Sequence, residues 1–197
     1  MKTYNYFSRL CIGIFIVIAG MLTVQAKDAP VNQFEETMQL EGQNLVLNGF
    51  GPYAINRVKM YTVGIYLPSR KSTAQDILAL PGVVRVKIVM LKTVESETMS
   101  RRFIADIHAN TSKEDRLKIA PQILTMGMAF GTVGDWNVGD IMTVDWLPGK
   151  GTVMRLNNKQ VMEAFKDPLV MQSILKIWIG ENVYDTKLKK LLVGDRD

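Results

Sequence analysis

The sequence predicts an α+β fold in which one antiparallel sheet is covered on one face by helices, an open-faced sandwich. The stretch 45–67 is rich in Val, Ile and Tyr over the length of two strands, with Gly, Pro and Asn between them. Residues 141–147 and 152–156 flank the turn sequence 148–151 (PGKG), which indicates a second hairpin. Stretches with helical spacing of apolar residues lie between and after these hairpins, so the order is mixed and not a regular β-α-β alternation.

The first 26 residues have the features of a cleaved secretory signal peptide. Lys2 and Arg9 precede the apolar run 10–22, and small residues lead up to Ala26. The run is too short for a comfortable transmembrane helix. We therefore expect cleavage after Ala26, a periplasmic or secreted location, no stable membrane anchor after cleavage, and a single domain over residues 27–197.

Composition narrows the classes of partner. Cys11 is the only cysteine and lies within the predicted signal, so the mature chain would have no disulfide and would depend on its core. Loss of Lys2 and Arg9 lowers the formal net charge from +5 to +3. Like charges do not form runs, and no basic stripe alternates with aromatic residues, so we expect no nucleic-acid partner. Without a basic amphipathic segment, binding to a membrane surface is only weakly suggested.

The N-terminal half predicts mainly strands. Residues 34–46 indicate a first strand or two leading into the stretch 45–67. Within 58–67 both alternating faces are mostly apolar, which predicts a strand covered on both sides. Thr62 lies in its middle, either for its β-branched shape or as one of the few polar groups lining a pocket.

The next segments predict a short helix, a strand and a longer helix. Ser72 or Thr73 can cap a helix that ends before Pro81-Gly82, and residues 83–91 alternate as a half-buried strand. A helix then runs to about Asn110, and its apolar stripe consists of Met99, Phe103 and Ile107. Arg102 and Asp106 lie at the edge of that stripe, four residues apart, where they can form an ion pair.

The C-terminal half predicts three more helices and a short strand. A helix begins at Ser112, and Pro121 divides or kinks it; residues 160–164 form the short strand. Asp167-Pro168 and Gly180 are typical of the two ends of a helix. The last helix starts near Asp185 or Thr186 and ends at Gly194. We expect it to bury three leucines: Leu188, Leu191 and Leu192.

Few kinds of chemistry are open to this sequence. His108 is the only histidine, so a metal site of His and Cys ligands cannot be assembled, and we predict no metal and no cofactor. His108 is expected to be a structural or surface residue and not a catalytic base. There is no phosphate loop and no nucleophile elbow. The remaining chemistry is polarisation or ligand anchoring by Tyr, Thr, Arg and Lys around an apolar cavity.

Several segments, in order, resemble the bacterial chalcone isomerase-like proteins. LNGFG at 47–51 followed by VKMYTVGIYL at 58–67 resembles the family signature LNGxG…KVYxxGLYL. Residues 139–140 (GD), 145–152 (DWLPGKGT) and 156–157 (LN) are similar to the middle of the family pattern, GD…DYxPGxGT…LNG. IWIG at 177–180, with LK and LVG after it, is similar to the family's ending. The resemblance extends from about residue 34 to 194.

The resemblance implies the chalcone isomerase fold, with a ligand cleft between sheet and helices. Plant members of the family cyclise chalcones without a cofactor, and related plastid proteins bind fatty acids. Thr62 matches a threonine that lines the isomerase cleft. Tyr53 stands where the family has an arginine that meets the ligand's charged or carbonyl end.

Other positions of the implied cleft have changed type. Met99 falls at the plant enzyme's active-site tyrosine and Ile177 at a threonine, so two hydroxyl positions are apolar here. Arg102 falls at a lysine and Asp106 at an asparagine. Such a cleft has fewer preorganised donors for a developing oxyanion, and it suits an acyl chain better.

The leading hypothesis is a non-catalytic, exported binding protein for a fatty acid or similar small apolar carboxylate, without catalytic residues. Tyr53, Thr62 and Arg102 would meet the carboxylate, unless Arg102 simply pairs with Asp106. One alternative is a cofactor-independent isomerase of the chalcone isomerase type, an intramolecular lyase acting on an enone-like substrate. Another is a structural or partner-binding module whose cleft is closed by its own side chains. The full set of predicted ligand-binding residues is Tyr53, Thr62, Met99, Arg102, Phe103, Asp106 and Ile177.

Overall fold

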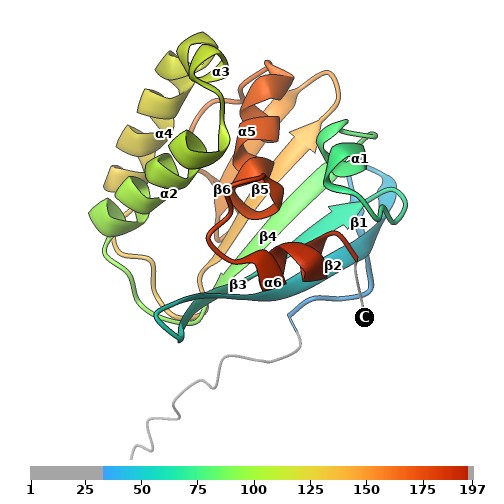
Figure 1. Cartoon of the computed structure of the whole chain (residues 1–197), viewed down its shortest axis with the longest axis horizontal. Helices are drawn as coiled ribbons and strands as arrows, with labels where there is room; N and C mark the ends of the chain where they lie inside the picture. The colour runs from blue at the N-terminus through green and yellow to red at the C-terminus, as the bar shows by residue number, and fades with distance from the viewer. Residues whose placement is uncertain (1–32, 195–197) are drawn as a thin grey trace, which may run out of the picture.

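Seven strands form one antiparallel sheet in which each strand pairs with the next along the chain. The computed structural model describes residues 33–194, and the predicted signal peptide and the start of the predicted domain lie outside them. The sheet is curled, and its order β1 to β7 confirms the expected α+β fold (Figure 1). The strands are β1 (Thr37–Leu40), β2 (Gln43–Ile55), β3 (Val58–Leu67), β4 (Val84–Met90), β5 (Ile141–Leu147), β6 (Gly151–Leu156) and β7 (Lys159–Gln160).

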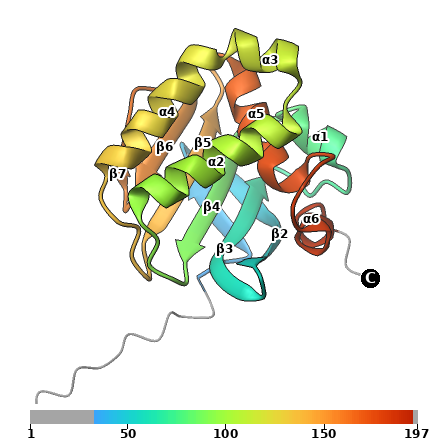
Figure 2. The ribbon, with the colours of Figure 1, turned by 60° about the vertical axis from the view of Figure 1, so that its left-hand side comes forward.

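The helices cover the inner face of the curl. The central helix, α5, buries most of its length against the sheet. Helices α2 and α4 run side by side over another part of the sheet (Figure 2). None of the helices within residues 33–194 is long and apolar enough to cross a membrane. The helices are α1 (Ala74–Leu78), α2 (Ser96–Asn110), α3 (Lys113–Lys118), α4 (Ala120–Thr132), α5 (Pro168–Ile179) and α6 (Thr186–Leu192).

The hairpin of β2 and β3 is the long central feature that the sequence predicts. Its turn is Asn56-Arg57, whose φ angles of 50° and 68° match the twist of the flanking strands. The Gly49–Pro52 segment does not form the turn and lies inside β2, next to a register shift after Leu47. Both faces of β3 are covered, as expected. Val63, Ile65 and Leu67 pack under the helices, and Tyr66 packs with a smaller cluster on the opposite face.

Asn48 and Gly49 attach the last helix to this hairpin. The side-chain amide of Asn48 donates to the carbonyl of Leu192 at 2.8 Å, and its oxygen accepts from the amide of Lys71 at 2.6 Å. Asn48 is 1% exposed, so both bonds are shielded from water. A Cβ at Gly49 would collide with the carbonyl oxygen of Leu191. The LNG sequence therefore allows α6 to approach the backbone of β2 closely.

A buried carboxylate joins three neighbouring strands. Asp145 on β5 is fully buried and accepts two hydrogen bonds from Arg85 on β4, at 2.6 and 2.7 Å. Arg155 on β6 donates to it at 2.9 Å. Two guanidinium groups thus compensate one buried charge.

The helical stretch that begins after Ser112 is divided near Pro121, as predicted: α3 ends at Lys118, and Pro121 sits in the first turn of α4, where its missing N–H costs nothing. Two other local predictions were wrong. The strand expected at 160–164 ends at Gln160, and the chain leaves the sheet before a single bridge at Phe165. Leu191 is 42% exposed, since Leu188 and Leu192, four residues apart, form the face of α6 that meets the core.

Candidate functional site

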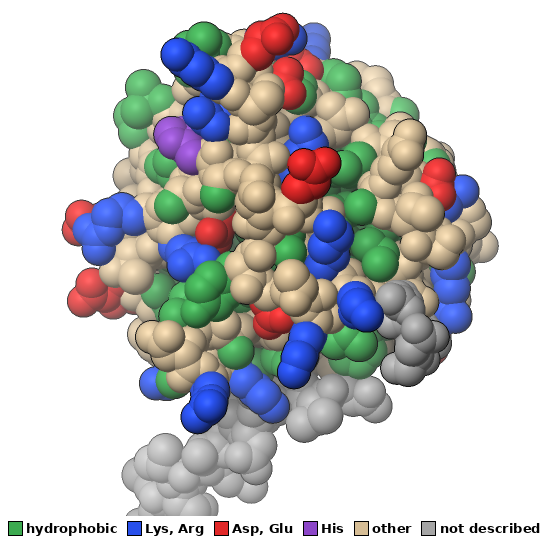
Figure 3. Space-filling model, in the orientation of Figure 1, with side chains coloured by type: hydrophobic (Ala, Val, Ile, Leu, Met, Phe, Trp, Pro, Cys, Tyr) green, Lys and Arg blue, Asp and Glu red, His purple; other side chains and the backbone are tan. Residues whose placement is uncertain are grey.

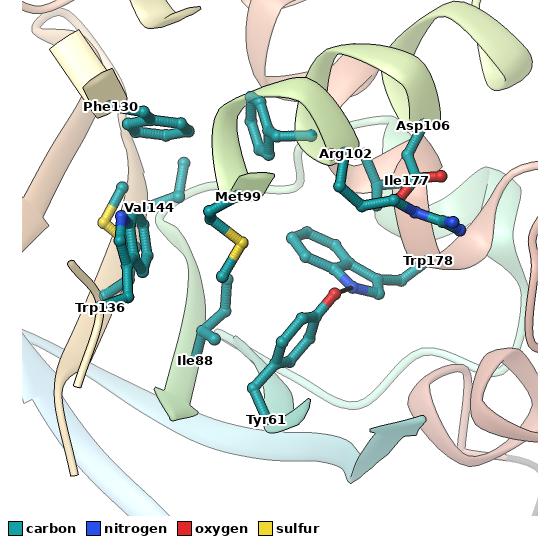
Figure 4. Close-up of a pocket in the computed structure, with 12 residues that line it drawn as sticks. Tyr61, Ile88, Met99, Arg102, Asp106, Phe130, Trp136, Val144, Ile177 and Trp178 are labelled. Atoms are coloured by element: carbon teal, nitrogen blue, oxygen red, sulfur yellow. Dashed lines mark hydrogen bonds and ion pairs between the residues drawn. The ribbon is translucent and has the colours of Figure 1, made fainter. Parts of the chain in front are cut away.

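A small, almost entirely apolar cavity lies between the sheet and α2 (Figure 4). Its volume is about 30 Å³, enough for one or two water molecules but not for a larger guest. Strands β3 to β5 supply its floor, α2 and α4 its cover, and α5 one wall. Its lining residues are Tyr61, Ile88, Met99, Arg102, Phe103, Asp106, Phe130, Trp136, Met142, Val144, Ile177 and Trp178.

Helical and strand periodicity place these side chains. Met99, Phe103 and Asp106 are three or four residues apart on α2, so they share the face that looks down onto the sheet. Tyr61 precedes Val63 on the helix-facing side of β3, in the principal core. Phe130 packs edge-on against both Phe103 and Trp136, with ring centroids 4.9 and 5.4 Å apart, and these contacts close one end of the cavity.

An ion pair on α2 marks the other end. The Nε of Arg102 lies 2.8 Å from an Asp106 carboxylate oxygen, and the two side chains are 34% and 15% exposed. Burial raises the pKa of Asp106, and the hydrogen bond from Arg102 offsets only part of this. Burial by itself would lower the pKa of Arg102, but the hydrogen bond to Asp106 and the electrostatic contributions of Tyr53, Asp106 and Tyr61 together outweigh it and leave the pKa raised. Arg102 therefore stays charged at the edge of an apolar cavity.

Two tyrosines surround that guanidinium. Its carbon lies 4.8 Å from the ring centroid of Tyr184 and 5.9 Å from that of Tyr53, both within cation–π range. Tyr53 also stacks on Tyr61, with centroids 4.7 Å apart and planes 7° from parallel. The aromatic rings and Asp106 thus hold Arg102 in one place.

The hydroxyl groups of the site are buried and neutral. The indole Nε1 of Trp178 donates to the hydroxyl of Tyr61 at 3.0 Å. The hydroxyl of Tyr53 is buried without a hydrogen-bond partner among residues 33–194. Burial raises the pKa of both tyrosines, that of Tyr61 well above its usual value. Both groups are therefore potential hydrogen-bond donors, and neither is a ready base.

The structure brings most of the predicted site residues together. Tyr53 lies just behind Tyr61 and contacts Arg102 from outside the lining. Thr62 does not lie with them, because it follows Tyr61 on β3 and so faces away from the helices. The interpretation of Thr62 as a polar group of this pocket was therefore wrong in geometry. The predicted residues that line the cavity are Met99, Arg102, Phe103, Asp106 and Ile177.

Sequence reasoning missed Tyr61 and Trp178, which supply the internal hydrogen bond of the cavity. For Tyr61 a signal was present: it shares a strand face with Val63, Ile65 and Leu67, the more apolar face of β3. A helix layer packs on the more apolar face of a sheet. For Trp178 no local signal existed, because its partner is 117 residues away along the chain.

Other chemistry is limited within the described part of the chain. No group of three or more His, Cys, Asp or Glu side chains there could hold a metal ion. His108 lines a separate surface groove and not the cavity. A larger open groove of about 840 Å³ lies at the C-terminal ends of α2 and α5, but it contains none of the predicted site residues.

Comparison with known proteins places this geometry in a family. The model of the family described as chalcone isomerase-like matches residues 26–194. No curated protein matches the chain significantly. Among solved structures, the crystal structure of a fatty-acid binding protein from Arabidopsis thaliana is similar, with a TM-score of 0.62 and 12% identity over 82% of this chain and 91% of that one. At that identity the likeness shows a shared fold, and the family match is the stronger finding: the chain belongs to the chalcone isomerase-like family.

Proposed function

We propose that this protein is a non-catalytic binding protein for a small amphipathic carboxylate such as a fatty acid. The carboxylate would bind at Arg102, and the acyl chain would enter the cavity beneath α2. The observation that carries the proposal is one charged guanidinium, partly buried and paired with Asp106, at the edge of a mostly apolar cavity. The shared fold with a plant fatty-acid binding protein is consistent with it.

Arg102 is suited to receive a second carboxylate. Asp106 is bonded to its Nε, which leaves the two terminal nitrogens of the guanidinium for a ligand. The unpartnered hydroxyl of Tyr53 lies beside this group and could donate a further hydrogen bond. A carboxylate bound by these donors would be oriented with its tail towards the cavity.

The cavity must expand to hold an acyl chain. Its volume of about 30 Å³ is far below the roughly 300 Å³ of a typical small-molecule pocket. Met99 and Phe103 are the covering side chains, and methionine adapts readily to a new shape. In the helix α2 that carries them, the N-cap residue Glu95 makes no side-chain cap bond, and the amide of Ser96 makes only a 3.4 Å bond to Asp135. Displacement of these side chains, together with the start of α2, would therefore open the cavity.

The isomerase alternative has weaker support from the geometry. The indole N–H of Trp178 is already donated to Tyr61, and Met99 and Ile177 replace two hydroxyl positions implied by the family resemblance. Few donors remain to stabilise an oxyanion in a transition state. The small volume of the cavity favours a different second candidate, a closed module that binds no small molecule.

The test is identification of a bound carboxylate and measurement of its affinity. The purified protein is denatured, extracted with organic solvent and analysed by mass spectrometry; delipidated protein is then titrated with palmitate. We expect Arg102→Ala to weaken binding about tenfold or more, because a charge-assisted hydrogen bond is lost. The matched control is Arg101→Ala, on the same helix but 64% exposed and paired with Glu97, which should bind as the wild type does.

The competing functions give different results. An empty extract, with no palmitate binding by any variant, would support the closed module. Acceleration of chalcone cyclisation that Arg102→Ala abolishes and Arg101→Ala retains would support the isomerase.

We also propose that the mature protein is exported and begins at Lys27, on the basis of the signal-like residues 1–26. The intact mass of the protein from the producing cell tests this. A mass that includes Met1 and the apolar run would contradict it.

A further inference from the structure

The outer face of the α3–α4 segment is unusual for a surface in water. Helix α4 contains no charged residue, although it lies at the edge of the molecule. On its inner side Ile123, Met126 and Phe130 are buried. On its outer side Leu124 is 63% exposed and Met128 58% exposed. A helix with apolar residues on both sides is normally buried on both sides. The outer side of α4 is instead exposed, and such exposed apolar surface often marks an interaction site.

A groove continues this apolar face onto the neighbouring helices. It has a volume of about 470 Å³ and lies between α2 and the α3–α4 segment. Leu117, at its edge, is 68% exposed. Its lining residues are Ile104, His108, Lys113, Arg116, Leu117, Ala120, Ile123 and Leu124.

The charged side chains that line the groove are both basic. Lys113 and Arg116 line it, and no acidic side chain does. Neither forms a salt bridge within residues 33–194, whereas the acids of α3, Glu114 and Asp115, are both paired with Lys118. Basic and apolar side chains adjoin at the upper left of the face shown in Figure 3, where α3 lies. One nitrogen of Arg116 donates to the carbonyls of His108 and Thr111, at 2.8 and 2.6 Å. The groove therefore combines exposed aliphatic groups with two positive charges that form no salt bridge.

We propose that this face, formed by Leu117, Leu124, Met128, Lys113 and Arg116, docks the protein reversibly on a membrane surface that contains anionic lipids. The aliphatic side chains would enter the boundary between headgroups and acyl chains, and the basic groups would meet the headgroups. A second copy of this chain fits less well, because a symmetric contact would bring Lys113 and Arg116 against their own counterparts. The face is not continuous in the sequence, because Lys113, Arg116 and Leu117 come from α3, whereas Leu124 and Met128 come from α4.

The proposed docking face lies on the outer side of the helices that cover the cavity. Phe130 of α4 and Phe103 of α2 line the cavity from the inner side of the same helix pair. A membrane that holds the outer side of α4 would therefore lie next to the cover of the cavity. The docking itself does not depend on the function proposed above, and it can be tested without any ligand.

The test is flotation of the purified protein with vesicles at roughly 0.1 M salt, where surface charge still acts. Pure phosphatidylcholine is compared with phosphatidylcholine containing about 30% phosphatidylglycerol. We expect binding to the anionic vesicles to exceed binding to the neutral ones by about fivefold or more, a ratio that one or two basic contacts supply. Lys113→Glu should lose about fivefold of the anionic binding. Its matched control, Lys187→Glu on the exposed surface of α6, should lose less than twofold.

A second pair of variants tests the apolar part. Leu124→Ser should reduce binding to anionic vesicles at least fivefold, since a leucine that enters the interface loses its apolar contact. The control is Val58→Ser, at the start of β3 in the β2–β3 hairpin, where the side chain is 41% exposed; it should leave binding unchanged. Equal binding by these two variants would overturn the proposal. So would equal binding of the wild type to both kinds of vesicle, or a dimer in solution that Leu124→Ser dissociates.

Discussion

The indole of Trp178 on α5 donates a hydrogen bond of 3.0 Å to the hydroxyl of Tyr61 on β3, in the wall of the cavity. Both side chains are buried, at 3% and 7% exposure. We expect Tyr61→Phe to lower the free energy of unfolding by about 1–3 kcal/mol, because the indole N–H keeps its burial and loses its partner. Urea denaturation followed by circular dichroism measures this. The control Tyr184→Phe removes a hydroxyl from a side chain that is 53% exposed, and an equal loss there would contradict the explanation.

Removal of the buried carboxylate of Asp145 should destabilise the protein more than Tyr61→Phe does. Asp145→Ala leaves Arg85 and Arg155 without their shared partner, and we expect a loss of about 3–5 kcal/mol in the free energy of unfolding. The exposed pair of Arg70 and Glu36 is the comparison, and Glu36→Ala should cost less than about 1 kcal/mol. Chemical denaturation of both variants under the same conditions checks the difference. Similar losses would mean that burial of the carboxylate is not what makes the Asp145 cluster important.

Gly49 and Gly131 form a matched pair for testing how α6 is attached. Gly49→Ala places a methyl group against the carbonyl of Leu191, so we expect α6 to be displaced and the free energy of unfolding to fall by about 1–3 kcal/mol or more. Gly131 lies in α4 with nothing near its missing Cβ, so Gly131→Ala should stabilise by up to about 1 kcal/mol. Thermal unfolding should thus show shifts of opposite sign. A rise in melting temperature for both would exclude the close approach of α6 to β2.

Asp106 predicts a dependence of stability on pH. Burial raises the pKa of Asp106 in the folded protein above the unfolded value of 3.8, despite the bond to Arg102. Between these two pKa values the folded state binds more protons, so the contribution of Asp106 to stability falls as the pH rises through this window. The difference in unfolding free energy between wild type and Asp106→Asn should therefore decrease from pH 4 to pH 7. Denaturation at several pH values measures it, and a constant difference would contradict the shift.

The same residue should affect ligand binding in the opposite way from Arg102. A carboxylate ligand at Arg102 would lie near the charge of Asp106, and like charges at such distances disfavour each other. We expect Asp106→Asn to tighten palmitate binding about tenfold at pH 7. Isothermal titration calorimetry of delipidated protein provides the measurement. Weaker binding in this variant would mean that Asp106 positions Arg102 more than it competes with the ligand.

Periodicity and turn chemistry were enough to predict most of the fold. Asp167, Pro168 and Gly180 mark the two ends of α5 as the structure has them, since capping depends on a few adjacent residues. The two faces of β3 could likewise be separated by alternation. Alternation does not state which face meets the helices, and so Thr62 was assigned to the pocket and Tyr61 was not. A comparison of the two faces of β3 would have given the correct answer, because the face with Tyr61 is the more apolar one.

Periodicity alone predicted the candidate site only along α2, and Ile177 of α5 was predicted from the family resemblance. Met99, Phe103 and Asp106 share a face of α2 because of their spacing, and the family resemblance drew attention to them. Residues such as Ile88 and Met142 come from strands that are paired across a gap of about fifty residues, and only the folded sheet shows that they meet. The volume of the cavity depends on the packing of all of them, which no local pattern contains.

The attachment of α6 to β2 also has a bearing on the order in which the chain can fold. Asn48 and its partner Leu192 are 144 positions apart in the sequence. As the polypeptide emerges from the ribosome with its N-terminus first, the β2 backbone around Gly49 is made long before the helix that covers it. Contacts of such sequence separation slow folding. The completed hairpin must therefore wait for synthesis to reach α6, and a nascent chain shorter than that exposes a β2 surface on which chaperones could act.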